Sequence, residues 1–174
     1  MGGALPDYIE PLRLAEAGAR LSGTVPVGQM SRLVPLLTEG AAAGSALIDF
    51  HFERDDESHP VLTGRVSVTL TVPCQRCLQA MTVPIDAPVR LRLVRRESEA
   101  PPDAEMLVVT AEPMLLASMV EEELLLNMPM TATHLEADCP VRLPPGQIST
   151  KKHPFAALAA LRGTGKQTKH PDIK

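Results

Sequence analysis

Three cysteines and one histidine are the residues whose types and spacing point most directly to chemistry. Cys74 and Cys77 are separated by two residues in the stretch CQRC. His134 and Cys139 lie five positions apart in HLEADC. Thiolates and imidazoles are the ligands that zinc prefers, and a C-x2-C turn supplies two neighbouring corners of a tetrahedron. These four side chains would complete a closed Zn²⁺ site if the fold brings the two halves together.

Two other interpretations of the cysteines stay open. More than fifty residues separate Cys77 from His134, unlike a compact zinc finger, so the thiols could instead be buried without metal. A C-x-x-C pair at the start of a helix is also the motif of thiol oxidoreductases, because the helix dipole lowers the thiol pKa. Here the pair joins two segments with strand-like alternation, which disfavours redox chemistry. Three cysteines, an odd number, do not form the disulfide framework of a secreted domain.

A run of three carboxylates, Glu121 to Glu123, lies in the strongest predicted helix. The helical wheel places Glu123 in the middle of the apolar face, where burial would raise its pKa, as acid–base catalysis requires. The sequence places no histidine or nucleophile beside it. We therefore assign structural roles to Glu121 and Glu123, and we expect Glu123 to be buried and paired with an arginine or a backbone amide.

Positive charge is concentrated in two parts of the chain. Arg65, Arg90 and Arg92 lie on predicted strands and could contact phosphates, although charges on edge strands also prevent aggregation. Residues 151–174 hold six Lys or Arg against one Asp, whereas residues 1–150 hold eleven against twenty Asp or Glu. A basic tail is a candidate contact for nucleic acid or another partner. The candidate contact residues of this tail are Lys151, Lys152, Phe155, Arg162, Lys166 and Lys169.

Composition excludes several classes of function. The 174 residues, 44% of them hydrophobic, suit one globular domain with a core of its own. Aromatic residues make up only 2%, which argues against recognition of single-stranded bases by stacking. No phosphate-binding loop or nucleophile elbow appears, so we expect no enzyme activity and no small-molecule substrate. No long apolar run or signal peptide is evident, which predicts a cytoplasmic protein without membrane contact.

Alternation of apolar and polar residues predicts the strands of a sheet. The pattern has period two in 46–53 and 61–72, with a polar turn between them, and again in 78–94. Pro84 and Pro88 interrupt the third segment, which predicts an edge or bulged strand. A further short strand is expected at 106–110.

Helical periodicity appears mainly after the predicted strands. Residues 111–127 form the strongest helix, with Thr110 as the expected N-cap and Pro129 enforcing its end. Residues 10–21 are expected to form a short strand and turn, and a short helix is expected within 25–37. The apolar face of the main helix is expected to contain Leu115, Leu116, Met119, Val120 and Leu126.

These elements predict an α+β fold in which an antiparallel sheet, roughly residues 45–109, is covered by one main helix. Residues 1–150 would form a single α+β domain. Residues 151–174 would add a short helix, HPFAALAALRG, and a flexible basic tail.

Four motifs in order, CQRC, MVEEELLLNMP, HLEADC and HPFAALAALR, make this chain resemble the YceD family over nearly its whole length. The resemblance implies a non-enzymatic role in ribosome biogenesis, supporting accumulation of the large-subunit (23S) rRNA. His153 stands where the family usually has an asparagine before Pro-Phe, while Phe155 is retained. The partner would be an rRNA precursor or a basic large-subunit ribosomal protein, which an acidic body suits at least as well as RNA. The alternative function is a thiol redox protein or sensor that uses Cys74 and Cys77.

Overall fold

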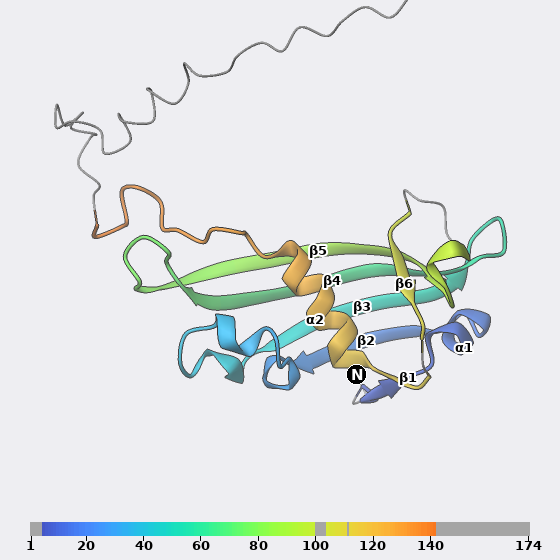
Figure 1. The fold of residues 1–174 in the computed structure, drawn as a ribbon. Helices are drawn as coiled ribbons and strands as arrows, with labels where there is room; N and C mark the ends of the chain where they lie inside the picture. Colours follow the sequence, from blue (N-terminus) through green and yellow to red (C-terminus); the bar gives the residue numbers. More distant parts are fainter. Residues whose placement is uncertain (1–4, 100–103, 111, 142–174) are drawn as a thin grey trace, which may run out of the picture. The chain divides into compact units, whose positions relative to one another are not determined.

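The computed structural model describes residues 5–99, 104–110 and 112–141, so every prediction made for residues 151–174 lies outside it. The main sheet contains five strands in chain order (Figure 1): β2 (Arg20–Pro26), β3 (Ser45–Arg54), β4 (Pro60–Pro73), β5 (Ala80–Val94) and β6 (Met106–Val108). Strands β2 to β5 are antiparallel neighbours, but β6 pairs with β5 in parallel, from Arg92↔Met106 to Val94↔Val108. The sheet is therefore mixed, and the prediction of a purely antiparallel sheet is wrong in this respect.

The predicted alternation explains how β4 and β5 pack. In β4, Leu62, Val66 and Leu70 are buried, whereas Arg65 and Thr69 between them are exposed. Because side chains alternate across a strand, one face of this hairpin enters the core and the other faces solvent. The strands predicted at 46–53 and 61–72 are confirmed, and the strand predicted at 78–94 is confirmed from Ala80 onward, since residues 78–79 belong to the turn.

Pro84 and Pro88 lie on a part of β5 that pairs only with β4 among the described residues. Strand β6 contacts β5 only at Arg92–Val94, beyond both prolines. A proline lacks the N–H that a second neighbouring strand would need, so it is tolerated at such an edge. The predicted edge position of this segment is confirmed.

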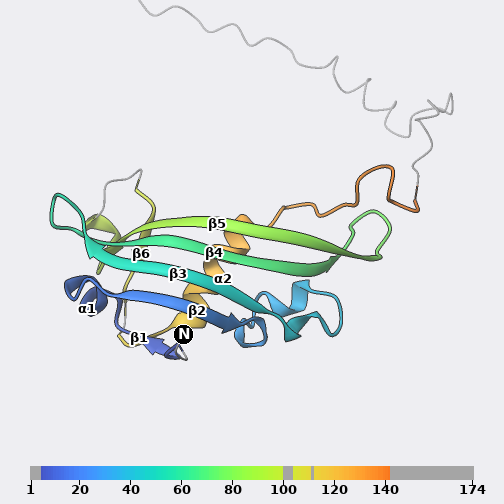
Figure 2. The ribbon, with the colours of Figure 1, turned by 180° about the vertical axis from the view of Figure 1, so that it is seen from behind.

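Helix α2 (Leu116–Asn127) lies across one face of the sheet, as Figures 1 and 2 show from the front and from behind. The helix begins later than the predicted residue 111, and Thr110 is not its N-cap. Met114–Leu115 instead form strand β7, which pairs with β1 (Tyr8–Ile9), and the Leu116 N–H donates to the Asp7 carbonyl at 2.9 Å. Met114 and Leu115, which local periodicity assigns to the helix, therefore form a short strand because their backbone pairs with the N-terminal segment.

The buried face of α2 is centred on Val120 and is rotated from the predicted face. Leu126 is 72% exposed, whereas Leu124 and Val120 are fully buried. Glu121 and Glu123 are also buried, at 4% and 8% exposure. The predicted burial of Glu123 is therefore confirmed, and the predicted burial of Leu126 is wrong.

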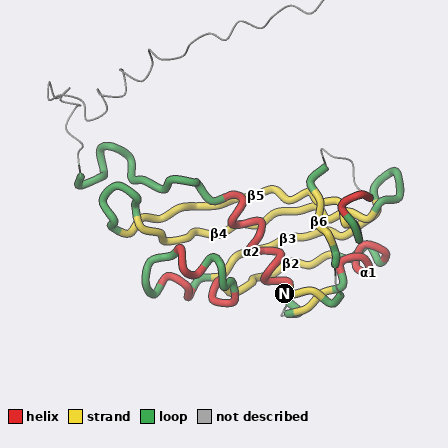
Figure 3. The backbone as a smooth tube through the Cα atoms, in the orientation of Figure 1, coloured by secondary structure: helices red, strands yellow, loops and turns green. Residues whose placement is uncertain are grey.

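The N-terminal third differs most from the sequence prediction. Helix α1 (Pro11–Glu16) occupies part of the segment expected to form a strand and turn, and Pro11 stands at its first helical position. After β2, the chain forms short 3₁₀ turns at Val27–Gln29 and Val34–Leu36 rather than the expected helix (Figure 3). Further 3₁₀ turns occupy Ala41–Ala43 and Glu97–Glu99.

The core lies between the sheet and α2. Phe50 and Phe52 of β3 are fully buried, with ring centroids 6.4 Å apart in an edge-on arrangement. Full burial of a side chain of this size contributes about 1.5–3 kcal/mol. Gly64, opposite Phe50, has a φ of 151°, and a Cβ there would lie 2.0 Å from the carbonyl oxygen of Asp49. Glycine is therefore required where β4 closely approaches β3.

Candidate metal centre

The connection between β4 and β5 carries Cys74 and Cys77. The Cys74 N–H donates to the Gln79 carbonyl and the Leu78 N–H donates to the Cys74 carbonyl, both at 2.8 Å. Leu78 has a φ of 63°, in the left-handed region that tight turns use. These bonds close the turn so that both cysteines can contribute to one cluster.

The segment after α2 supplies the other half of the site. The Gln75 N–H donates to the carbonyl oxygen of Ala132 at 2.8 Å, which joins this segment to the CQRC turn. The Cys139 N–H donates to the Leu135 carbonyl at 3.1 Å and closes a second turn. Together these contacts place His134 and Cys139 beside the β4–β5 connection.

The four predicted ligands, hereafter the thiol cluster, come together as Cys74, Cys77, His134 and Cys139. One ligand atom from each lies within 4.8 Å of all the others, and Cys77 Sγ is 3.4 Å from His134 Nδ1. Zinc–sulfur bonds of about 2.3 Å place tetrahedral sulfurs roughly 3.8 Å apart, so a small contraction would complete the geometry. Cys74 and Cys139 are buried, and all three cysteines are free thiols.

Hydrogen bonds prepare one thiol for metal binding. Burial acts to raise the pKa of Cys74, but backbone N–H groups of Cys77, His134 and Arg76 oppose it and lower the pKa to about 6. The N–H groups of Arg76 and His134 each approach Cys74 Sγ at 3.4 Å. Burial raises the pKa of Cys77, and the neighbouring sulfurs of Cys74 and Cys139 raise it further, against an opposing N–H from Gln79. Thiolate is the form that binds metal, so Cys74 is ready to coordinate at neutral pH.

The donor set fits zinc and the structural class of zinc site. Three sulfurs and one imidazole nitrogen are soft or borderline ligands, and four protein ligands fill a tetrahedron. A catalytic zinc usually keeps one position for water or substrate. A metal held here would join the β4–β5 connection to the segment after α2.

Glu121 has the pairing that was expected of Glu123. Its carboxylate accepts N–H bonds from Arg32 at 2.6 Å and Leu33 at 3.0 Å, and the Arg32 guanidinium lies 3.3 Å away. Glu121 therefore attaches α2 to the segment after β2. Sequence reasoning missed Arg32, because no periodicity relates it to a helix nearly ninety positions away.

Glu123 is buried without the expected partner. No described residue donates a hydrogen bond to its carboxylate, and only its backbone carbonyl accepts one, from Asn127. Burial raises the pKa of the Glu123 carboxyl, and the neighbouring carboxylates of Glu105 and Glu122 raise it further. Glu105 was also missed, since a single acidic residue in a predicted loop gives no functional signal.

Two of the three strand arginines have acidic partners. Arg65 pairs with Asp86 at 2.6 Å, and Arg92 lies 3.4 Å from Asp55. No described carboxylate lies within 4.0 Å of Arg90. The three side chains therefore do not form a stripe of uncompensated positive charge.

This chain is an α+β protein in which a helix covers a sheet and a closed Cys₃His cluster lies at one hairpin turn. The family model described as "Large ribosomal RNA subunit accumulation protein YceD" matches residues 62–162, more than half of the chain. The chain belongs to this family. The matched range includes α2 and all four residues of the thiol cluster.

A curated relative extends the similarity beyond the matched range. The large ribosomal RNA subunit accumulation protein YceD of Haemophilus influenzae is 23% identical over 173 residues, covering 91% of this chain and 96% of the relative. No solved structure matches the chain. Among the residues that the structure describes, no helix has the length and apolar character needed to cross a bilayer.

Proposed function

We propose that this protein supports accumulation of large-subunit ribosomal RNA as a non-enzymatic, cytoplasmic assembly factor that binds a precursor component. Membership of the YceD family carries this proposal, since the family description and the curated relative both name accumulation of the large ribosomal RNA subunit. The role would be to hold a precursor component while the subunit assembles.

The thiol cluster supports a binding role rather than catalysis. Its four ligands would enclose a zinc ion with no coordination position left for substrate. In this proposal Cys74, Cys77, His134 and Cys139 hold Zn²⁺, which stabilises the surfaces formed by the β4–β5 connection and the segment after α2. Binding of a structural zinc typically contributes on the order of 10 kcal/mol to folding of its site.

The charge distribution limits how the precursor is bound. Residues 1–150 carry twenty acidic against eleven basic side chains, and Arg65 and Arg92 are already paired. A broad phosphate-binding face on this part of the chain would meet repulsion from its carboxylates. We therefore place any RNA contact in residues 151–174 and a protein contact in residues 1–150.

The test is the level of large-subunit rRNA in cells that lack the protein. We expect large-subunit rRNA to fall relative to small-subunit rRNA, which is the internal control, and to recover with the wild-type chain. A chain ending at residue 150 should restore it only partly if the basic tail contacts RNA. Unchanged large-subunit rRNA in the deletion strain would refute the proposed function.

The pKa of Cys74, lowered to about 6, also favours a thiol redox function. Two observations oppose it: Cys74 is fully buried, and the C-x-x-C pair lies in a hairpin connection rather than at a helix N-terminus. Alkylation of the metal-loaded protein with iodoacetamide distinguishes the two functions. Rapid modification of Cys74 would support redox chemistry, whereas protection until a chelator is added supports the structural site.

A further inference from the structure

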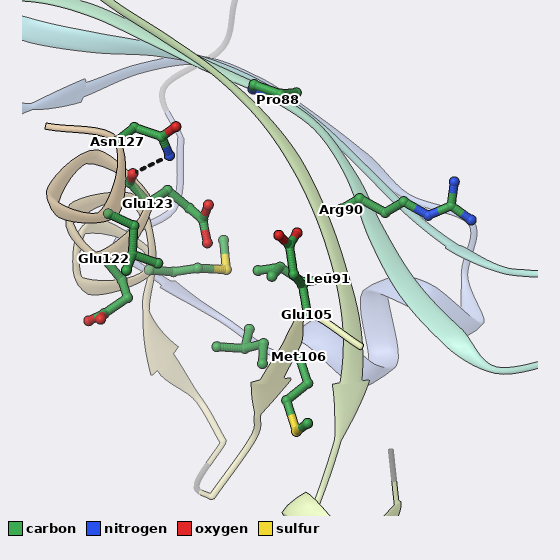
Figure 4. Close-up of a pocket in the computed structure, with 11 residues that line it drawn as sticks. Pro88, Arg90, Leu91, Glu105, Met106, Glu122, Glu123 and Asn127 are labelled. Atoms are coloured by element: carbon green, nitrogen blue, oxygen red, sulfur yellow. Dashed lines mark hydrogen bonds between the residues drawn. The ribbon is translucent and has the colours of Figure 1, made fainter. Parts of the chain in front are cut away.

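A hollow of about 670 Å³ lies between α2 and the β5–β6 edge of the sheet (Figure 4), away from the residues of the thiol cluster. Glu123 and Met119 line it from α2, Leu91 lines it from β5, and Met106 lines it from β6. Glu105, the residue before β6, completes the acidic part of its wall. We call this feature the Glu123 hollow.

Glu123 is the feature of this hollow that most needs explanation. Its side chain points into the hollow in Figure 4, the residue is only 8% exposed, and no described residue donates a hydrogen bond to its carboxylate. Its carboxylate oxygens are not among the fully enclosed polar atoms of the described residues, so they open onto the hollow, where a ligand can reach them. By contrast, Glu121 on the same helix is fully engaged by Arg32 and Leu33.

The charges around Glu123 favour a cation from outside. Glu105 faces the same hollow, and no described cation lies within 4.0 Å of its carboxylate (Figure 4). Glu122 also lines the hollow but pairs with Arg32. Arg90 belongs to the lining, yet Figure 4 shows its guanidinium pointing away from Glu105 and Glu123. The two uncompensated carboxylates make the hollow a site for positive charge.

Apart from Asn127, whose side-chain amide donates to the Glu123 carbonyl, the rest of the wall is mainly apolar and restricts the kind of cation. Leu91, Met106, Met119 and Leu126 surround the carboxylates, and Leu126 is a large exposed apolar side chain. A divalent metal ion needs several oxygen ligands at one point, and the carboxylates of this wall are not among the described groups close enough together to hold one. Lysine and arginine combine a charged end with an aliphatic stem, and methionines adapt to such stems.

We propose that the Glu123 hollow binds a lysine or arginine side chain from a basic segment of a protein partner. The aliphatic stem would pack on Met106, Met119 and Leu91, and the cationic end would lie between Glu105 and Glu123. Phosphate groups are repelled by the same carboxylates, so RNA does not fit this site. This inference names the partner class for the assembly role proposed above and rests on that role for its biological meaning.

A direct binding measurement with the full chain tests the inference. The probe is a fluorescent peptide of about ten residues in which lysine alternates with alanine, and the matched peptide has every lysine acetylated, which removes charge but keeps the stem. We expect Glu123→Gln and Glu105→Gln each to weaken lysine-peptide binding about five- to tenfold, as loss of a charged hydrogen-bonding partner does. Acetylated peptide should bind weakly to all variants.

Glu39→Gln is the matched control, because Glu39 is exposed, does not line the hollow, and changes the net charge equally. Equal affinities of the three variants for the lysine peptide would overturn the inference. Glu105 is exposed, so Glu105→Gln tests the site even if the change at Glu123 perturbs folding. Binding of Mg²⁺ alone, or of a short RNA, that is lost in Glu123→Gln would also overturn it, by assigning the hollow to another ligand.

The result for the Glu123 hollow can be distinguished from the result for the proposed function. Peptide affinities that do not depend on Glu105 or Glu123, together with reduced large-subunit rRNA in the deletion strain, would refute only the site. Unchanged rRNA with carboxylate-dependent peptide binding would refute the assembly role and leave the site intact.

Discussion

The thiol cluster and the Glu123 hollow both gather polar side chains from segments far apart in the sequence, but they differ in how those groups are satisfied. In the thiol cluster, N–H groups approach Cys74 Sγ, and the three other ligands lie within 4.8 Å of it. In the Glu123 hollow, two carboxylates face a cavity without a described cationic partner. A set of mutually satisfied ligands is suited to stabilising the fold, whereas carboxylates that open onto a cavity without a cationic partner are suited to binding another molecule.

The largest effect should come from removing a ligand of the thiol cluster. We expect His134→Asn to abolish stoichiometric zinc binding and to lower the free energy of unfolding by roughly 3 kcal/mol or more. His51→Asn is the matched control, because His51 lies half-buried on the sheet away from the cluster. Elemental analysis of protein purified without chelator, followed by urea unfolding, measures both quantities.

A chelation experiment on the wild-type protein would show whether the prediction of a zinc site is wrong. If the wild-type protein contains less than about a tenth of an equivalent of zinc and a chelator leaves its unfolding curve unchanged, the cluster is a set of buried thiols rather than a metal site.

A smaller effect is expected at Glu121, the carboxylate of α2 that is fully paired. Glu121→Ala would leave the N–H groups of Arg32 and Leu33 without their acceptor, so we expect a loss of about 2–4 kcal/mol. Glu122→Ala, the adjacent control, removes only an exposed pair with Arg32 and should cost about 0.5 kcal/mol or less. Urea unfolding compares them, and similar losses in both variants would contradict the assigned difference.

The smallest effect on the free energy of unfolding is expected at Glu123, where substitution should raise stability rather than lower it. Burial raises its pKa in the folded state, so the folded protein holds this proton more tightly than the unfolded chain does. This group therefore lowers stability as the pH rises from the unfolded carboxyl pKa, about 4.3, through the raised folded value. Glu123→Gln should stabilise the protein at neutral pH by a few tenths of a kcal/mol, because solvent screens this partly accessible carboxylate, and the gain should disappear near pH 4.

The measurement is the difference in unfolding free energy between Glu123→Gln and the wild type across this pH range. Glu39→Gln, at an exposed position, serves as the control and should show no such trend. A variant that is less stable than the wild type at neutral pH would mean that Glu123 has a stabilising partner and that the hollow is not available for a ligand.

Local patterns were sufficient for the central strands. In β3, β4 and β5 one face is buried and the other is solvated, so alternation in the sequence maps directly onto the structure. The start of α2 was different, because Met114–Leu115 pair with Tyr8–Ile9, more than a hundred positions away. No local signal could indicate that backbone pairing with the N-terminus would replace the first turns of the helix.

The same distinction applies within the candidate sites. Cys74 and Cys77 were identified from their spacing, and His134 and Cys139 from their type. Glu105 was not identified, since its importance depends on the cavity that it faces. The roles of Glu121 and Glu123 were incompletely predicted, because a wheel shows which side chains share a face but not which backbone amides lie opposite.

The sequence by itself determined the strand pattern, the main helix, the chemical types of the metal ligands and the family, because each depends on residue types and short-range spacing. Only the tertiary structure decided that two distant segments join into one thiol cluster, that β6 joins the sheet in parallel, and that Glu121 is paired while Glu123 is not. These outcomes depend on contacts between residues widely separated along the chain. Such contacts are selected by packing and by the satisfaction of buried polar groups, which local sequence does not encode.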